Sequence, residues 1–325
     1  MSKIIFRHIA IVAFLSAVLL IMQTGCDGED GQRHTRELTI FHAGSLSVPF
    51  GDICEAFNAL HPDIAIKAEA AGSRRCARKI SDLDMRCDVM ASADYKVVEN
   101  LLMPDHADFN ILFALNEMAI AYSDESKLAD KINSTNWPQI LLRDDVILGR
   151  ADPDSDPCGY RTLMVLQLAE KFYGIAGLAA NLEQKGDGRY VRPKETDLLA
   201  LLESDQIDYL FIYRSVAAQH GLKMILLDDK INLKSSKLKA LYNSASVKVT
   251  GKKPGEFIIR KGEPMVYSVT IPKNACNPSL AAEWVGFLLS PKGKAIMEAN
   301  GQQCLKPAKA DGFDNLPEAL KSFCK

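Results

Sequence analysis

The 325-residue chain lacks a large excess of charge of either sign, because 39 Lys and Arg against 41 Asp and Glu give a formal net charge of −2. A near-neutral chain does not create the basic field that holds nucleic acids, so we expect no nucleic-acid partner. The sequence also lacks CxxC pairs and the Cys/His spacing of zinc sites, which argues against a zinc centre or a thioredoxin-like redox motif.

The apolar run near the N-terminus is too short for a membrane span. Ile9–Met22 is apolar except for Ser16 and covers fourteen residues, whereas a spanning helix needs about 20. Basic residues precede the run, so we predict a secretion signal over residues 1–25. The signal ends in Gln23-Thr24-Gly25-Cys26, which resembles the lipobox of bacterial lipoproteins and implies a lipid anchor on Cys26. An ordinary cleaved signal is the alternative, and both predict an exported protein.

A polar segment follows the signal. Asp27 to Glu37 contains two glycines and no apolar side chain, which predicts a tether over residues 26–37. The body from Leu38 onward is long enough for two domains. Seven cysteines follow Cys26, and an odd number leaves at least one without an intramolecular partner. Which of them pair stays open.

Strand and helix patterns alternate along the body. We expect strands at about 38–41, 64–68, 88–91, 146–149 and 209–213, and helices at about 50–60, 74–80, 162–172 and 279–301. Such alternation predicts an α/β fold with mixed, mostly parallel sheets flanked by helices. Two further apolar strands, at 117–122 and 265–271, are candidates for crossovers between two lobes.

Three carboxylates stand where the fourth of these strands gives way to a helix. Asp152, Asp154 and Asp156 alternate through a loop whose helix N-terminus is a ready anion site. They could cap the helix, hold a cation or bind the central atom of an unusual anion. A calcium loop is discounted, because the glycine and the terminal glutamate of that motif are missing.

Hydroxyl and small residues recur where the predicted strands end. In sheets of this kind ligands bind at the carboxyl ends of strands, where small residues admit a compact ligand and hydroxyls donate hydrogen bonds. The segments at these ends are Gly44-Ser45, Gly72-Ser73, Ser92-Ala93, Cys158-Gly159 and Tyr213-Arg214-Ser215. Any single serine could instead be an N-cap. Their recurrence at successive strand ends predicts a site for a fully ionised oxyanion.

Several segments, taken in order, resemble one known family over nearly the whole body. They are His42-Ala43-Gly44-Ser45-Leu46, Ala71-Gly72-Ser73, Ala91-Ser92-Ala93-Asp94-Tyr95, Asp152-Pro153, Asp156-Pro157-Cys158-Gly159-Tyr160-Arg161 and Tyr213-Arg214-Ser215 with the residues up to Gly221. These segments resemble the molybdate/tungstate-binding lipoproteins of ABC importers, in particular the archaeal-type tungstate-binding branch. The resemblance implies a two-lobe periplasmic-binding-protein fold of type II with two crossovers. Lobe 1 would comprise residues 38–122 plus 260–325, and lobe 2 residues 123–259.

The same resemblance implies roles for individual residues. Ser45 and Ser73 would donate hydrogen bonds from lobe 1, and the backbone N–H of Cys158 and the hydroxyl of Tyr213 would donate from lobe 2. Asp152 falls on the Asp-Pro of the wider family and would be a ligand of tungsten or molybdenum, or a near-ligand.

The resemblance to the archaeal branch implies a six-coordinate metal, bound by an aspartate of this loop and by a second carboxylate from a glutamate. We expect that glutamate just before the Tyr-Arg-Ser segment, where this chain has Ile212. Glu195 is the candidate substitute. Asp154 and Asp156 are expected to face solvent or to cap the helix.

The implied protein is a monomeric, exported and membrane-anchored solute-binding protein. It would deliver tungstate or molybdate to the permease of an ABC importer, with no cofactor and no chemistry of its own. Two alternatives stay open: a binding protein for sulfate or another tetrahedral oxyanion, and a secreted thiol enzyme that uses Cys158 with His42 or His220. The basic run Arg74–Lys79 is expected to be a solvated helix face whose charge helps to attract an anion.

Overall fold

The computed structural model describes residues 36–253 and 255–325. The predicted signal, Cys26 and most of the predicted tether lie outside the described residues. The first strand, β1, begins at Arg36, two residues before the predicted start of the body. Within the described part, no helix is both long and apolar enough to cross a membrane, and all seven cysteines are free.

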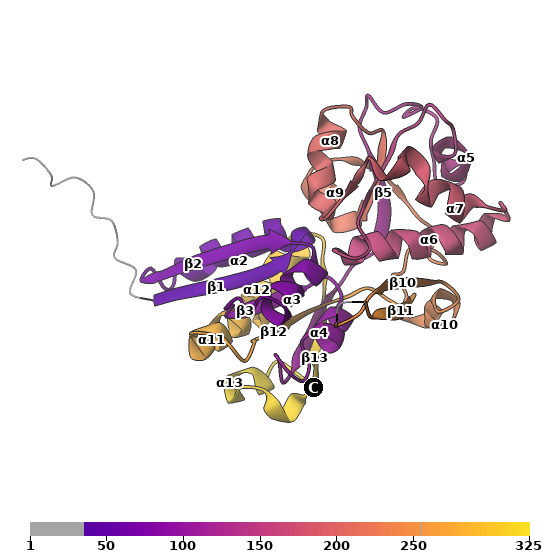
Figure 1. Ribbon diagram of the computed structural model, residues 1–325. Coiled ribbons are helices and arrows are strands. Elements are labelled where there is room, and N and C mark those ends of the chain that lie inside the picture. Colours follow the sequence, from indigo (N-terminus) through magenta and orange to yellow (C-terminus); the bar gives the residue numbers. More distant parts are fainter. Residues whose placement is uncertain (1–35, 254) are drawn as a thin grey trace, which may run out of the picture. The chain divides into compact units, whose positions relative to one another are not determined.

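The first sheet has six strands (Figure 1). In pairing order these are β13 (Gln303–Asp311), β4 (Asn110–Leu115), β12 (Val266–Thr270), β3 (Val89–Ser92), β1 (Arg36–Ala43) and β2 (Ile64–Ala71). β1 pairs in parallel with β2 and β3, whereas β12 pairs antiparallel with both β3 and β4. The sheet is therefore mixed, and its parallel strands direct their carboxyl ends, with Ser45 and Ser73 just beyond, to one edge.

Helices cover both faces of the first sheet, because its strand β1 is apolar on both sides. Leu38 and Ile40 of β1 lie in the main core with residues of α2 and α11, whereas Phe41 lies in a second core with residues of α3 and α4. The helical segments of this part are η1 (Gly44–Leu46), α2 (Ser47–Asn58), α3 (Ser73–Ser81), α4 (Tyr95–Leu101), α11 (Pro278–Leu289), α12 (Pro291–Ala299), η5 (Phe313–Asn315) and α13 (Glu318–Lys321).

The second sheet has five strands. In pairing order these are β7 (Val191–Arg192), β6 (Leu148–Ala151), β8 (Tyr209–Tyr213), β5 (Met118–Tyr122) and β9 (Lys223–Leu226). Its helical segments are α5 (Trp137–Leu141), α6 (Pro157–Tyr173), α7 (Leu178–Glu183), η2 (Lys185–Gly188), η3 (Glu195–Leu198), α8 (Leu199–Glu203) and α9 (Arg214–Gln219). β6 pairs in parallel with β7 and β8, so the loops after β6, β7 and β8 meet at one edge.

A separate hairpin packs on α6. It consists of β10 (Ser246–Thr250) and β11 (Phe257–Lys261), preceded by η4 (Ser236–Leu238) and α10 (Lys239–Tyr242). The amide of Gln167 in α6 bonds the backbone of Ser246 in both directions, through Nε2 and Oε1 at 2.9 Å each. The hairpin is thereby held along the helix that begins at the candidate site.

The chain passes between the two sheets through short segments. The first passage consists of Asn116 and Glu117 between β4 and β5. The return passage runs from β11 to β12 and contains Met265. The segment at Asn232 ties the two together, since the N–H of Met118 donates to its carbonyl (3.0 Å) and the N–H of Met265 donates to that of Leu233 (2.9 Å).

Two sequence-based boundaries differ from this arrangement. Residues 118–122, which the sequence assigned to lobe 1, form β5 and pair with β8 and β9 of the second sheet. β5 is therefore part of the second sheet, and the crossover consists only of Asn116 and Glu117. The predicted helix at 279–301 is two helices, because Pro291 has no N–H for a continuous helix and Ser290 caps the second one by accepting from the N–H of Gly293 (3.2 Å).

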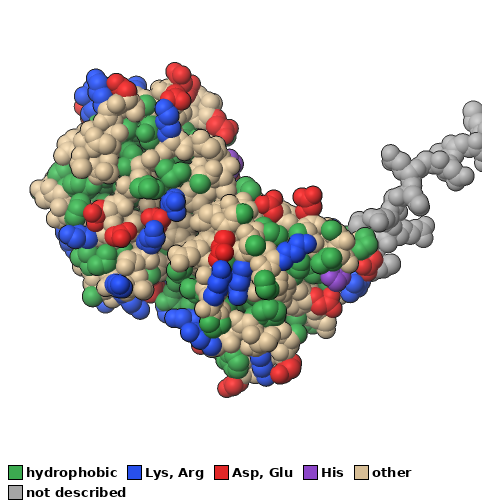
Figure 2. All heavy atoms as spheres, turned by 180° about the vertical axis from the view of Figure 1, so that it is seen from behind, with side chains coloured by type: hydrophobic (Ala, Val, Ile, Leu, Met, Phe, Trp, Pro, Cys, Tyr) green, Lys and Arg blue, Asp and Glu red, His purple; other side chains and the backbone are tan. Residues whose placement is uncertain are grey.

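Figure 2 shows side chains of both charges on the face that it draws. Acidic and basic side chains are interspersed there between hydrophobic and neutral ones. This distribution fits the near-neutral net charge of the whole chain.

Candidate functional site

The loop between β6 and α6 buries only one of its three carboxylates. Asp156 is 2% exposed and caps α6, with its Oδ1 accepting from the N–H of Cys158 at 2.8 Å and Pro157 at the first helical position. Gly159 lets this turn pack tightly, since a Cβ there would lie 2.5 Å from the carbonyl carbon of Asp152. The backbone N–H of Cys158, which we expected to be free for a ligand, is therefore bonded to Asp156.

Asp152 serves the loop itself. Its Oδ1 accepts from the N–H of Asp154 (3.0 Å) and its Oδ2 accepts from the hydroxyl of Ser155 (2.6 Å). The carboxylate of Asp154 accepts from the N–H of Thr250 in the hairpin (2.7 Å). Neither of these two carboxylates is buried, so Asp156 is the one carboxylate of this loop that lies in the interior of the protein.

Glu195 is buried beside Asp156. It is the first residue of η3, is 1% exposed, and its N–H donates to Oδ2 of Asp156 at 3.2 Å. Neither carboxylate oxygen of Glu195 accepts a hydrogen bond from a donor group of the described residues, and its side-chain neighbour is the carboxyl group of Asp156. Burial, followed by the charge of Asp156, raises the pKa of Glu195 well above 4.5, and burial raises the pKa of Asp156. Because an unsatisfied buried polar group costs about 1–3 kcal/mol, this arrangement points to a ligand.

Three hydroxyl groups lie at the carboxyl ends of strands, two in the first sheet and one in the second. Ser45 in η1 and Ser73 at the start of α3 are each 1% exposed, and Tyr213 at the end of β8 is fully buried. Each hydroxyl oxygen accepts one hydrogen bond: from Tyr267 to Ser45 (3.0 Å), from the N–H of Ala93 to Ser73 (3.0 Å), and from Nη1 of Arg161 to Tyr213 (3.0 Å). The hydroxyl hydrogens are therefore available to a ligand.

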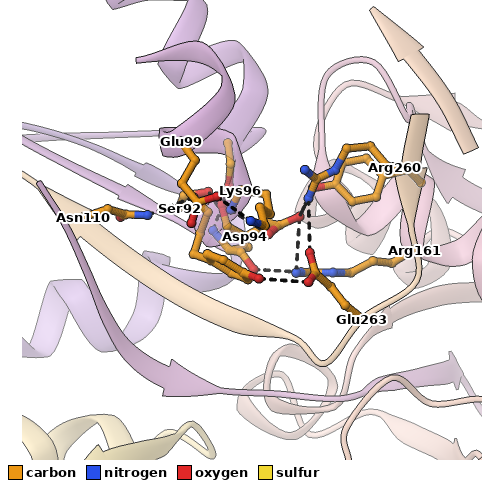
Figure 3. A network of polar contacts seen from close by, with 12 residues as sticks. Ser92, Asp94, Lys96, Glu99, Asn110, Arg161, Arg260 and Glu263 are labelled. Atoms are coloured by element: carbon orange, nitrogen blue, oxygen red, sulfur yellow. Dashed lines mark hydrogen bonds and ion pairs between the residues drawn. The ribbon is translucent and has the colours of Figure 1, made fainter. Parts of the chain in front are cut away.

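Arg161 joins the two halves of the site. Its Nη1 also donates to the carbonyl of Ala93 (2.7 Å), and its Nη2 lies 3.7 Å from Oδ2 of Asp94. The same carboxylate oxygen accepts from Arg260 of β11 (2.7 Å) and from the hydroxyl of Tyr160. In Figure 3, the carboxylate of Asp94 lies between the two arginines, and a dashed line joins Glu263 to Arg260, 3.8 Å away.

A second set of contacts joins the start of α3 to the loop between β6 and α6. Nε of Arg74 donates to the carbonyl of Asp154 (3.0 Å), and the N–H of Arg75 donates to the carbonyl of Ser155 (3.2 Å). Arg74 is 1% exposed, and Arg78 donates to the carbonyl of Gly251 (2.7 Å). The expectation of a solvated face is thus wrong for Arg74, because the α3 arginines satisfy backbone carbonyls of a loop and a hairpin that the sequence did not place nearby.

The thiol of Cys158 does not resemble an activated nucleophile. It is fully buried, its Sγ lies 3.6 Å from the carbonyl oxygen of Phe211, and burial raises its pKa well above 9.0. His42 bonds the carbonyl of Ala43 instead, and His220 is exposed. A catalytic thiol needs a lowered pKa and a neighbouring base, so this geometry argues against the thiol-enzyme alternative.

A model of the bacterial extracellular solute-binding proteins matches residues 38–303. The chain belongs to this family. The family consists of proteins that bind solutes outside the cytoplasm, which agrees with the fold and the exported location that the sequence predicted.

The relatives agree with the resemblance drawn from the motifs. A solute-binding protein of Petrotoga mobilis is 49% identical, over 90% of this chain and 91% of its own. The molybdate/tungstate-binding protein WtpA of Pyrococcus abyssi is 42% identical, over 96% of this chain and 97% of its own. The predicted resemblance is confirmed.

A solved structure shows the same fold. The periplasmic molybdate-binding protein of Azotobacter vinelandii matches with a TM-score of 0.57 over 82% of this chain and 98% of its own, at 15% identity. The predicted two-lobe α/β fold is confirmed by this likeness, which at such identity concerns the fold alone.

Hydrogen bonds through Ala93 and Arg161 link Ser73 to Tyr213, two of the residues singled out from the sequence. Ser45, Ser73, Tyr213 and Glu195 are all buried at the ends of their strands. Sequence reasoning gave no role to Asp94, Arg161 and Tyr160, although all three stand in the quoted motifs. Arg260 carried no signal, because it comes from a hairpin strand 166 positions from the carboxylate that it meets.

We expect the Glu195→Gln variant to lose a pH dependence of stability. Because the pKa of Glu195 is raised above 4.5, the folded protein holds this proton more tightly than the unfolded chain does. The stabilisation is fully present below pH 4.5 and is lost as the pH rises through the folded-state pKa. Thermal unfolding of ligand-free protein between pH 4.5 and 8 should show a steeper decline for wild type than for Glu195→Gln. The exposed Glu203→Gln is the control; parallel curves for all three proteins would contradict the assignment.

Proposed function

We propose that this solute-binding protein captures tungstate or molybdate between its two lobes and presents the closed, loaded form to the permease of an ABC importer. It binds and releases the anion without changing it. The observation that carries this proposal is Glu195, whose buried carboxylate oxygens accept no hydrogen bond from a donor group of the described residues although hydroxyl donors line the neighbouring strand ends.

The carboxylates favour a metal oxyanion over other tetrahedral anions. A carboxylate next to a dianion is repelled, and the repulsion grows where water is excluded. It can be tolerated if the carboxylate is protonated or if its oxygen bonds the central atom. Tungsten(VI) and molybdenum(VI) have vacant coordination positions, whereas sulfur in sulfate has none.

We assign the carboxylate roles to Asp156 and Glu195. They take the place of the pair formed by Asp152 and a glutamate at position 212, where this chain has Ile212. Ser45 and Ser73 donate hydrogen bonds from lobe 1, and Tyr213 donates from lobe 2. With two carboxylate oxygens added to four oxo ligands, the metal would become six-coordinate.

Thermal unfolding with four anions tests the function. Tungstate and molybdate at 100 times the dissociation constant should stabilise the protein by about 2.7 kcal/mol. Sulfate and phosphate at the same concentrations should stabilise it much less. If no anion raises the melting temperature, the protein is not an oxyanion carrier; if sulfate raises it as much as tungstate, the sulfate alternative holds.

Two substitutions of the same kind locate the carboxylate ligand. Glu195→Gln replaces the carboxylate that would bond the metal with an amide and should lower the preference for tungstate over sulfate at least about tenfold, measured by calorimetry. Asp152→Asn is the matched control, because Asp152 bonds only its own loop. A loss of preference in Asp152→Asn alone would return the ligand role to Asp152.

We further propose that Cys26 carries a lipid and holds the protein, as a monomer, at the outer face of the cell membrane. The family is extracellular, and residues 23–26 resemble a lipobox, with Gln23 in place of the usual aliphatic residue. Cell fractionation tests the anchor: Cys26→Ser should move the protein from the membrane to the soluble fraction, and an unchanged distribution would contradict the anchor.

A further inference from the structure

A serine or tyrosine hydroxyl can donate a hydrogen bond or accept one, and its other partners decide which. In a site for an oxyanion every hydroxyl must donate, because an acceptor oxygen aimed at the anion is repelled. The direction of the hydrogen bonds behind Ser45, Ser73 and Tyr213 therefore matters as much as their positions.

Two of the three hydroxyls receive bonds from groups that can only donate. Ser73 accepts from the backbone N–H of Ala93, and Tyr213 accepts from the guanidinium of Arg161. Neither an amide N–H nor an arginine can accept in return. The hydrogens of Ser73 and Tyr213 must consequently point elsewhere.

Ser45 is different, because its partner is itself a hydroxyl. Tyr267 could donate to Ser45 or accept from it, and the direction is decided by what lies behind Tyr267. Nδ2 of Asn116 donates to the Tyr267 oxygen at 2.9 Å, and Tyr267 in turn donates to Ser45 at 3.0 Å. The direction of the hydrogen bonds that join Asn116, Tyr267 and Ser45 thus depends on the orientation of the Asn116 amide.

The Asn116 amide is held in that orientation from its other end. Its Oδ1 accepts from the N–H of Glu117 (2.9 Å) and from the N–H of Ser215 (3.4 Å). Two backbone N–H groups can bond only an oxygen, so Nδ2 must face Tyr267 and the hydroxyl of Ser215, to which it also donates at 2.7 Å. All three residues that these hydrogen bonds join are buried, with Asn116 at 7% exposure and Tyr267 at 0%.

We propose that Asn116 is a positioning residue for oxyanion binding: through Tyr267 it fixes Ser45 as a hydrogen-bond donor toward the bound anion. The inference rests on the proposed function and adds to it the selection of anions whose oxygens only accept. Asn116 does not touch the anion. It acts from the passage between β4 and β5, where no motif assigned it a role.

The isosteric substitution Asn116→Asp should reverse the direction of these hydrogen bonds. In Asn116→Asp the oxygen that replaces Nδ2 accepts from Tyr267, whose own oxygen then accepts from Ser45, so that Ser45 turns a lone pair toward the anion. Tungstate affinity measured by calorimetry should fall about 30-fold. Tyr267→Phe leaves Ser45 free to donate and should cost no more than about threefold.

The double variant separates hydrogen-bond direction from charge. Asn116→Asp with Tyr267→Phe keeps the added carboxylate but removes the hydroxyl that transmits the reversal, so affinity should recover to within about threefold of Tyr267→Phe alone. Recovery on adding a second substitution cannot come from repaired folding. An undiminished loss in the double variant would overturn the proposal in favour of simple charge repulsion.

A second variant covers the case in which Asn116→Asp does not fold, and binding by wild type separates a failure of the proposed function from a failure of this inference. Should Asn116→Asp fail to fold, Asn116→Leu tests the same hydrogen bonds: without the amide, Tyr267 is no longer fixed as the donor to Ser45, so affinity should fall by less than in Asn116→Asp, and this loss should disappear in the Tyr267→Phe background. If wild type binds neither tungstate nor molybdate, the proposed function and this inference both fall. If wild type binds and the double variant does not recover, the inference falls alone.

Discussion

Tungstate binding by a Gly72→Ala variant is expected to be more than about 100-fold weaker than in wild type. A Cβ at this position would lie 2.3 Å from the carbonyl oxygen of Ser155 and 2.7 Å from that of Pro193. Both are backbone atoms of loops at the edge of the second sheet and cannot swing aside. The backbone of Gly72 itself, at φ −58° and ψ 136°, suits any residue. The substitution therefore leaves each lobe able to fold and obstructs their approach.

Calorimetric titration with tungstate measures the loss, and solution scattering of the loaded protein shows whether the lobes approach. Gly51→Ala is the matched control, because an added Cβ in α2 meets no atom within 4 Å and alanine favours a helix. Gly51→Ala should bind as wild type does. Wild-type affinity in Gly72→Ala would mean that the contact between α3 and the two loops plays no part in binding.

Asp94→Ala should lower the free energy of unfolding by about 3–5 kcal/mol, since it leaves two buried arginines without their carboxylate. Arg161 is 3% exposed, Arg260 is 7% exposed, and both direct an Nη2 toward Asp94. The substitution also removes the cap of α4, whose N–H at Lys96 bonds Asp94 at 3.0 Å. Urea unfolding at pH 7 gives the difference directly.

The pKa of the same carboxylate predicts the pH range in which the folded protein loses stability in acid. Burial raises the pKa of Asp94, but the charges of Arg260 and Arg161 outweigh burial and bring the pKa from 3.8 to about 2. The stabilisation is therefore present above pH 3.8 and is lost as the pH falls toward 2. Asp105→Ala, which breaks an exposed pair with Lys252, is the control and should unfold as wild type does. Equal stabilities of Asp94→Ala and Asp105→Ala would refute the buried role of Asp94.

Local pattern was sufficient for the elements and for the strand-end residues. Alternation of apolar strands with helical faces predicted the order of β1, α2, β2, α3 and β3, and Ser45 and Ser73 follow their strands as expected. These features depend on neighbours within a few positions, which is the range over which periodicity and turn chemistry act.

The choice among carboxylates could not be made in this way. Asp152, Asp154 and Asp156 have similar local surroundings, and what distinguishes Asp156 is the backbone of Glu195, 39 positions away. The burial of Arg74 likewise depends on Thr250, 176 positions away, whose hydroxyl accepts from it at 3.1 Å. Pairings at such distances are properties of the assembled sheets, and a single sequence holds no local record of them.

The passages between the sheets set how an anion can leave. Backbone hydrogen bonds to Asn232 and Leu233 tie the first passage and the return passage into one narrow ribbon, and Nδ2 of Asn232 also bonds Glu117 at 3.1 Å. Such a ribbon bends easily but resists sliding, so the lobes should part by rocking about a single line. Ser45 is only two hydrogen bonds from Asn116 on that line and would move least. Release would then be stepwise, with the anion leaving the distant donors first and Ser45 last.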